Sequence, residues 1–413
     1  MSKAAGRVAW AFAPRFRRGA FGWRSEPAIA RIKEAISEIK AVRKVDALLA
    51  AEGAVLFLQK VSPALQNIDG SSGAIGTAVN RAIDALVPVI ANAPAPPALR
   101  RNWLEQLYQA HADDQVPYIE HLADDWGELC ASPELATEWA DRLAGTVDTM
   151  WSRGRQEHGY FHGTNMCLSA LLAAGRHDQL LALLEKAPYT FWAYRQWGVK
   201  ALVAQGRKAE ALQYAEASRG LNAPLGQIAE TCEAILLSSG MADEAYRRYA
   251  IDANRAGTYL ATFRTICRKY PYLKPDAVLA DLVASTPGEE GKWFAAAKDA
   301  KLYGVALTLA QTSPVDHRTL IRAADDFAGT EPGFALNCGV LALYWICAGR
   351  AYDVTNSNIL RAYELTMQAA ERAQCKAAAL AQVRKMLDDF PQEQMVKGAL
   401  ARVAELWDAD PGA

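Results

Sequence analysis

One pattern is repeated in two neighbouring stretches, VKALVAQGRKAEALQYAEAS (Val199–Ser218) and CEAILLSSGMADEAYRRYA (Cys232–Ala250). Each stretch contains a run of small and apolar residues that ends at a glycine, Gly206 or Gly240. Glycine readily adopts the left-handed backbone conformation that closes a helix C-terminus. Five residues after each glycine, an alanine opens the apolar face of a second helix, and alanines let antiparallel helices approach closely. The pattern therefore predicts two helix hairpins.

Three further copies of this signature are found elsewhere in the chain. The residues at the glycine position are, in chain order, Gly175, Gly206, Gly240, Ala300 and Gly349. The residues five positions later in the first four copies are Leu180, Ala211, Ala245 and Val305. The first two intervals, 31 and 34 residues, are the length of a helix-hairpin repeat. The later intervals, 60 and 49 residues, fit one degenerate copy and one insertion.

Repeats of this length stack, because a single helix pair cannot bury its apolar face alone. The segment GRKAEALQYAEAS resembles the second helix of tetratricopeptide-type repeats, although the full signature of that family is missing. We therefore expect an all-α fold, an irregular alpha-solenoid of antiparallel helix pairs. The expected organisation is a basic N-terminal arm (1–24), an N-terminal helical region (25–150), helical-hairpin repeats (151–373) and C-terminal capping helices (374–413).

The composition is that of an ordinary globular chain. Of its 413 residues, 22% are charged and 51% are hydrophobic. The net charge of −1 gives no global reason to expect a nucleic-acid or membrane partner. No uninterrupted apolar run reaches the roughly 18 to 20 residues of a membrane span, and Pro14 and Arg15 interrupt any secretory signal. We expect no membrane span and a cytoplasmic location.

The seven cysteines are widely spaced, and no two of them form a C-x-C or C-x-x-C pair. This pattern argues against a disulfide framework and against a cysteine-rich zinc site. We expect small core residues in a reducing compartment.

Residues 1–24 form a basic segment with six Lys or Arg residues and no Asp or Glu. The aromatic residues interleaved with these charges are Trp10, Phe12, Phe16, Phe21 and Trp23. One interpretation is an arm that binds a phosphate backbone or anionic lipid, with the rings stacking on bases or anchoring at the interface. The other is a tail that packs on the protein's own acidic surface or stays disordered. We favour the second, because short basic termini are common.

Between Glu105 and Asp141 the chain contains ten Asp or Glu residues, counting both ends, and no Lys or Arg. The sharpest constellation is in YIEHLADDWGEL and consists of Glu120, His121, Asp124 and Asp125. On a helix these residues are neighbours, and a histidine with two carboxylates could bind a divalent metal. A charge run is more often a solvated face, so we assign no metal ligand here. The region could instead receive the basic arm.

A second candidate cluster lies in WSRGRQEHGYFHGTNMCLSA, where His158 and His162 are four residues apart and Cys167 follows. A zinc site could use this spacing on a helix. Gly159 and Gly163 disfavour a regular helix, so we interpret the segment as packing between repeat units. We expect no catalytic, cofactor-binding or metal residue with diagnostic spacing.

Two further patterns have structural interpretations. In FWAYRQWG, Phe191, Trp192, Tyr194 and Trp197 are expected in the core of a repeat junction. In STPGEEGKWF, Thr286 is expected to cap a helix that begins at Pro287, with Glu289 completing a capping box. The Glu289–Glu290 pair then needs no catalytic role. TSPVDHRTLIRAADDF predicts another helix start near His317.

The segments YLATFRTICRKYP, VLADLVASTPGEEGKWFAAAKDAKLYGVAL and RTLIRAADDFAG resemble a widespread bacterial family of uncharacterised helical-repeat proteins, a domain of unknown function. The resemblance covers about residues 24–373. Related repeats occur beside SWIM-type zinc fingers, but the C-x-C pair of that finger is absent here. The resemblance implies an all-helical, cytoplasmic, bacterial protein, and it transfers no catalytic residue.

Three functions follow, in order of preference. The first is a non-catalytic scaffold that binds a protein or peptide, which rests on architecture. The second is a nucleic-acid-associated protein that uses residues 1–24 together with Arg100, Arg101, Arg153 and Arg155. The third is a metal-dependent enzyme built on the Glu120–Asp125 or His158–His162 segment, although neither segment supplies a nucleophile–base pair or a cofactor loop.

Overall fold

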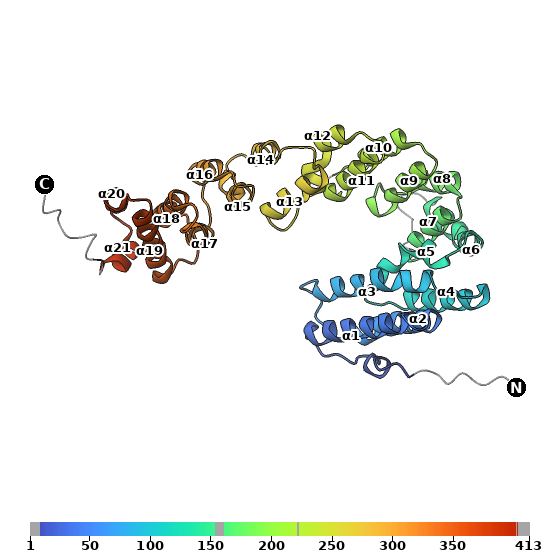
Figure 1. The fold of residues 1–413 in the computed structure, drawn as a ribbon. Coiled ribbons are helices and arrows are strands. Elements are labelled where there is room, and N and C mark those ends of the chain that lie inside the picture. Colours follow the sequence, from blue (N-terminus) through green and yellow to red (C-terminus); the bar gives the residue numbers. More distant parts are fainter. Residues whose placement is uncertain (1–8, 153–160, 221–222, 402, 404–413) are drawn as a thin grey trace. The chain divides into compact units, whose positions relative to one another are not determined.

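The structure is a computed structural model, and it describes residues 9–152, 161–220, 223–401 and 403. Within these residues the chain forms twenty-one α-helices, three short 3-10 helices and no strand (Figure 1). The helices pack in adjacent pairs, which confirms the predicted all-α solenoid of antiparallel helix pairs. The chain divides into two compact units, Met1–Ile228 (unit 1) and Ala229–Ala413 (unit 2). The boundaries expected after residues 24, 150 and 373 stay predictions.

The helices of unit 1 are η1 (Ala13–Arg15), α1 (Ser25–Arg43), α2 (Ala47–Leu65), α3 (Ala74–Ala91), α4 (Pro97–Ala112), η2 (Glu120–Ala123), α5 (Trp126–Cys130), α6 (Pro133–Ser152), α7 (Thr164–Ala173), α8 (His177–Glu185), α9 (Trp192–Ala204) and α10 (Lys208–Glu216). Helix α11 (Leu225–Leu237) includes the division between the units. The helices of unit 2 are α12 (Ala242–Ala253), α13 (Tyr259–Lys269), α14 (Pro275–Ala284), η3 (Glu290–Trp293), α15 (Phe294–Asp299), α16 (Tyr303–Thr312), α17 (His317–Phe327), α18 (Pro332–Cys347), α19 (Asn356–Arg372), α20 (Lys376–Asp389) and α21 (Gln394–Leu400).

Six hairpin turns in the described residues share one backbone geometry. Each contains a residue with positive φ: Gly175 (71°), Gly206 (76°), Gly240 (74°), Lys301 (60°), Gly349 (66°) and Gln374 (56°). The next residue donates its N–H to the carbonyl five positions back, as Arg207 does to Leu202 at 2.9 Å. This Schellman arrangement satisfies carbonyls that a helix end leaves without partners. It confirms the four glycine turns that the sequence predicts.

The predicted turn at Ala300 is wrong by one residue. Lys301 adopts the left-handed conformation, and Ala306, five positions later, is fully buried. Val305, which was expected at the small buried position, is 44% exposed. The reason is that a lysine is rarely left-handed, so sequence alone gives no signal for the turn. The same applies at Gln374, where a hairpin closes against the buried Ala379.

Ion pairs connect α4 with α6, α13 with α15 and α17 with α19, at about one repeat length. They are Arg101–Glu138 (2.6 Å), Arg142–Glu105 (2.6 Å), Arg264–Asp299 (2.5 Å) and Arg361–Asp325 (2.9 Å). The paired residues are 35 to 37 positions apart. Exposed pairs of this kind contribute about 0–1 kcal/mol each, so they mark the register of the stack more than they stabilise it.

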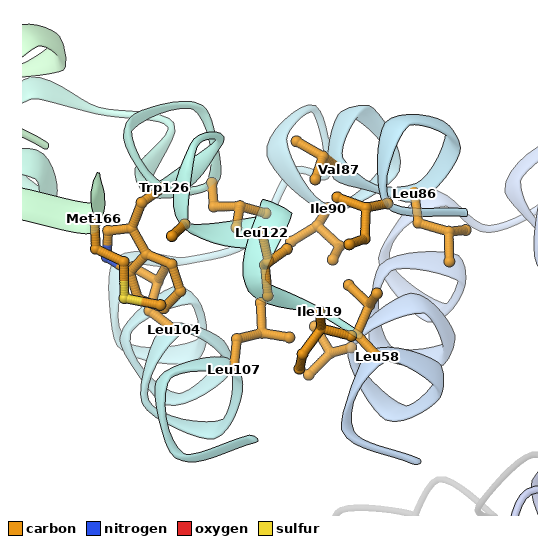
Figure 2. Close-up of a cluster of buried hydrophobic side chains, with 14 of the residues drawn as sticks. Leu58, Leu86, Val87, Ile90, Leu104, Leu107, Ile119, Leu122, Trp126 and Met166 are labelled. Carbon is orange, nitrogen blue, oxygen red and sulfur yellow. The ribbon is translucent and has the colours of Figure 1, made fainter. Parts of the chain in front are cut away.

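The core of unit 1 is continuous from the first helices to α9. Figure 2 shows its centre, where Leu58 of α2 and Ile90 of α3 lie close to Ile119 and Leu122 of the η2 region. Trp126 of α5 is fully buried and packs edge-to-face on Trp139, with ring centroids 4.9 Å apart. Burying a large apolar side chain stabilises a fold by about 1.5–3 kcal/mol. This core holds the short η2–α5 segment in place.

Three aromatic side chains in the described part of the basic segment, residues 9–24, are also built into this core, whereas Trp23 is 67% exposed. Trp10, Phe12 and Phe16 are buried, and the Phe16 and Phe57 rings pack edge-to-face at 5.1 Å. The ring of Trp10 lies over Gly53, where a Cβ atom would come within 2.2 Å of it. These aromatic side chains cannot stack on bases without leaving the core.

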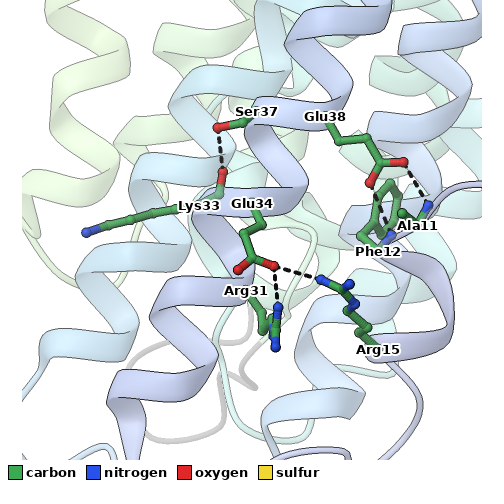
Figure 3. Close-up of polar contacts among 8 residues, drawn as sticks. All are labelled: Ala11, Phe12, Arg15, Arg31, Lys33, Glu34, Ser37 and Glu38. Carbon is green, nitrogen blue, oxygen red and sulfur yellow. Dashed lines mark hydrogen bonds and ion pairs between the residues drawn. The ribbon is translucent and has the colours of Figure 1, made fainter.

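Polar contacts fasten the same segment to α1 (Figure 3). The N–H groups of Ala11 and Phe12 donate to Glu38 at 2.7 and 3.1 Å, and Arg15 pairs with Glu34 at 2.8 Å. In the described residues the arm therefore meets acids of α1, and its ion pair does not go to the acidic region that begins at Glu105. Nucleic-acid binding through residues 1–24 stays a prediction, and residues 1–8 lie outside the described chain.

Two helices of unit 1, α2 and α3, are long and apolar enough to cross a membrane by length and composition alone. Neither helix is an uninterrupted apolar run in the sequence, but the mean hydropathy along each helix is high enough to pass this test. The structure packs both helices in the core, where α2 buries Phe57, Leu58 and Val61. A buried core helix passes the same test, so the finding is weak evidence for a span.

Two local predictions of helix starts have opposite outcomes. The capping box at Thr286 is wrong: α14 ends at Ala284, and the Thr286 hydroxyl accepts a hydrogen bond from Trp293 Nε1 at 2.7 Å. A turn follows instead of a helix because Gly288 has a φ of 86°. The helix start near His317 is confirmed.

The aromatic cluster of α9 is only partly in the core. Trp192 and Trp197 are buried as predicted, but Phe191 is 54% exposed and Tyr194 is half-buried. Phe191 precedes the first residue of the helix, so its ring does not share the buried face.

Candidate binding surface on unit 1

Five elements of unit 1, α3, η2, α5, α7 and α9, pack in a row. Helix α3 contacts η2 and α5, these contact α7, and α7 contacts α9. Six polar residues that these elements and the turn before α5 supply interact with one another, and we call them the polar cluster. Its members are Asp84, His121, Asp124, Asp125, Asn165 and Lys200.

The tight turn of η2 places His121 beside Asp124. The N–H of Asp124 donates to the His121 carbonyl at 3.1 Å, and the His121 Nδ1 atom lies 3.1 Å from Asp124 Oδ2. The opposite side of the same turn buries Leu122 and Ala123. The sequence correctly pairs these two residues, but a 3-10 turn of period three joins them instead of an α-helix.

Neighbouring helices complete the surroundings of this pair. Asn165 of α7 donates from Nδ2 to Asp124 Oδ1 at 2.8 Å. Asp84 of α3 lies 3.8 Å from His121 Nε2 on the other side of the ring. His121 is therefore between two carboxylates that come from different elements.

The backbone of Asp124 is fastened to α7. The Ser169 hydroxyl donates to the Asp124 carbonyl at 2.9 Å and accepts from the Gly127 N–H at 2.9 Å. A Cβ atom on Gly127 would lie 2.6 Å from the Ser169 carbonyl oxygen, so only glycine permits this approach. The backbone that carries Asp124 is therefore fixed against α7.

Lys200 contributes the opposite charge from α9. Its Nζ atom lies 4.1 Å from the centroid of the Trp197 ring, a cation–π contact. Burial lowers the pKa of Lys200, while the charges of Asp124 and Asp125 oppose that shift. The ammonium group therefore belongs to the same electrostatic environment as the two carboxylates.

The titration behaviour of the polar cluster is perturbed. The Asp124 hydrogen bond raises the pKa of His121, which favours the imidazolium form. Burial raises the pKa of Asp125 to about 6, against the lowering effect of His121. Perturbed carboxylates are frequent at functional sites, because function often needs a charge that folding alone would exclude.

The remaining predicted site residues are separate from this cluster. The backbone of Glu120 hydrogen-bonds with His111, and its charge helps to raise the pKa of Tyr194. His158 lies outside the described residues. His162 is exposed and packs against His111, whereas Cys167 is buried, and burial raises the pKa of its thiol to about 12. Among the described residues, no group of three or more His, Cys, Asp and Glu is arranged to hold a metal ion.

Sequence reasoning missed Asp84, Asn165 and Lys200. The available signal was repeat spacing: Asp84 is 37 residues before His121, and Asn165 is 35 residues before Lys200. Positions one repeat apart lie on adjacent helices of a stack. No family model matches this chain, and no curated protein matches it.

Proposed function

We propose that this chain is a non-catalytic scaffold that binds a protein or peptide. The observation that carries the proposal is the polar cluster, which draws side chains from α3, from η2 and the turn after it, from α7 and from α9. A surface of that construction can contact an extended partner at several points, as stacked helical repeats commonly do.

The chemistry of the polar cluster supports binding more than catalysis. Its carboxylates accept hydrogen bonds and Lys200 donates them, so N–H and C=O groups of a partner chain find complementary groups. His121 is engaged by Asp124 and is close to Asp84, so the imidazole does not activate a serine or cysteine nucleophile.

A selection from a library of random linear peptides tests this function. Wild-type protein is compared with the double variant D124N/K200M, which removes one acid and one base from the polar cluster. The matched control is E138Q/R101M, which removes one acid and one base from an exposed pair linking α4 and α6. We expect sequence enrichment with wild type and control and its loss with D124N/K200M.

Two outcomes contradict the proposal. One is the absence of any enriched peptide on wild-type protein. The other is equal enrichment of the same peptides on wild type and D124N/K200M, which would place binding elsewhere.

A further inference from the structure

A cavity of about 850 Å³ lies in unit 1 between the ends of two helices. Its walls include Gln66 after α2, Asp113 and Asp114 after α4, Arg18 of the N-terminal segment and His162 before α7. None of these residues belongs to the polar cluster. The volume is within the roughly 300–1,000 Å³ of small-molecule sites.

The cavity is negative at one wall for two independent reasons. Helices α2 and α4 both end there, and a helix C-terminus carries partial negative charge on its last carbonyls. Asp113 and Asp114 add two carboxyl groups. Asp114 is only 8% exposed; Ser62 and the Ile119 N–H donate to it, and burial raises its pKa.

The Asp114 N–H donates to the carbonyl of His111, a buried residue that does not itself line the cavity. His111 is 3% exposed, and its ring packs edge-to-face on His162 with centroids 6.1 Å apart. Burial lowers the pKa of His111, so the ring is neutral near pH 7. It hydrogen-bonds with the Glu120 backbone, while its Nε2 atom has no partner among the described residues. Buried polar atoms without partners are rare, and a neutral imidazole that donates through one nitrogen accepts through the other.

Arg18 supplies the complementary charge on the same cavity. Its Nε–H donates to Gln66 Oε1 at 3.2 Å, which holds the guanidinium at the cavity wall. A guanidinium recognises carboxylate or carbonyl oxygens. The cavity thus offers acceptors for a cation, from Asp113, Asp114 and the helix ends, and one donor for an oxygen atom, the Arg18 guanidinium.

We propose that this cavity binds an α-ammonium group with its neighbouring carbonyl or carboxylate. The ammonium lies against Asp113, Asp114 and the ends of α2 and α4, and the oxygen lies toward Arg18. The ligand is a free amino acid or the amino terminus of a peptide, which share this chemistry. A phosphate would meet the two carboxylates and is disfavoured. This inference does not depend on the proposed scaffold function, because no residue of the polar cluster takes part.

Titration calorimetry tests the assignment with defined probes. The probes are the twenty free amino acids, added singly, and tetra-alanine with either a free or an acetylated amino terminus. The variant is D113N, and the control is D178N. Both aspartates are exposed, and each accepts a hydrogen bond from a glutamine amide, of Gln109 or Gln205. Both substitutions are therefore equally mild for folding.

We expect binding of a free-amine probe to wild type and D178N, and about tenfold weaker binding to D113N, the size of one modest ionic contact. Binding of free amino acids alone assigns a small metabolite, and binding of the free-amine peptide assigns a chain terminus. The proposal is overturned if no probe binds wild type, if the acetylated peptide binds as tightly as a free-amine probe, or if D113N binds as tightly as D178N. Loss of the peptide selection in D124N/K200M with amine binding intact separates the two proposals.

Discussion

Unit 1 and unit 2 each contain a carboxylate that folding shields from water, partly in unit 1 and fully in unit 2, and the surroundings of the two differ. Glu233 of α11, in unit 2, has a side chain only 1% exposed. It accepts hydrogen bonds from Lys269 Nζ at 2.6 Å, Tyr270 Oη at 2.6 Å and Asn254 Nδ2 at 2.7 Å. Asp125 in unit 1 is half-buried, and its pKa is raised to about 6.

The difference separates a structural charge from a candidate functional one. Three donors from α13, from the residue after it and from the end of α12 compensate the charge of Glu233, as a buried ion requires. The surroundings of Asp125 leave its ionised form at a disadvantage. A fold tolerates such a cost where the group serves binding, because stability alone would replace it.

The largest expected change in stability comes from removing Glu233, whose charge three donors compensate. E233L leaves Lys269, Tyr270 and Asn254 without their shared acceptor, and we expect a loss of about 3 kcal/mol in the free energy of unfolding. Urea unfolding followed by circular dichroism measures it. The control is E230Q on an exposed position of the same helix, which should change little. Equal stability of E233L and E230Q would mean that Glu233 is not structural.

The second largest effect is expected from disturbing the close contact between α5 and α7, which holds the backbone next to the polar cluster. G127A places a methyl group 2.6 Å from the Ser169 carbonyl and 2.7 Å from Ala173 Cβ. We expect a loss of about 2 kcal/mol, because a tightly packed contact between α5 and α7 must open. The control is G145A in α6, where an added Cβ meets nothing within 4 Å. If G127A is as stable as G145A, the close approach of α5 and α7 is not required.

A smaller effect of opposite sign is expected at Asp125. D125N removes a charge whose burial is unfavourable, so we expect stabilisation of about 1 kcal/mol at pH 7.5. The full pKa shift would correspond to more, but partial exposure of Asp125 screens the interaction.

The pH dependence of that effect has a definite sign. The ordinary pKa of an aspartate is 3.8, and that of Asp125 in the folded chain is about 6. Folded protein therefore holds the proton between these values, and wild type loses stability as pH rises from about 4 through 6. The advantage of D125N should grow over that range and then stay constant. Thermal unfolding at pH 4.5 and 7.5 measures it, and an advantage that shrinks with rising pH would contradict the shift.

The smallest change in the free energy of unfolding is expected when an exposed carboxylate loses its partner. R101M removes the partner of Glu138, an exposed pair one repeat apart, and we expect a change below about 0.5 kcal/mol. The same urea titration in low and high salt measures it. A change as large as that of E233L would show that the exposed ion pairs between helices stabilise the stack and do not only mark its register.

Local chemistry in the sequence was sufficient for the repeating part of the fold. Gly175, Gly206, Gly240 and Gly349 signal helix ends, because the left-handed turn they adopt depends on a residue without a Cβ atom. The buried residues five positions after the first three follow from the same helical period. The pairing of His121 with Asp124 was accessible for the same reason, since three residues separate them.

Only tertiary packing decided the remainder. Lys301 and Gln374 are left-handed because the stacked helices on both sides demand a turn there, against their own preference. The burial of Trp10 and Phe16 depends on the groove beside Gly53 and Phe57, which no local pattern reveals. The polar cluster and the cavity beside Asp113 and Arg18 join residues that are distant in sequence. Their chemistry arises from which helices stack side by side, a property of the whole unit that no single stretch of sequence contains.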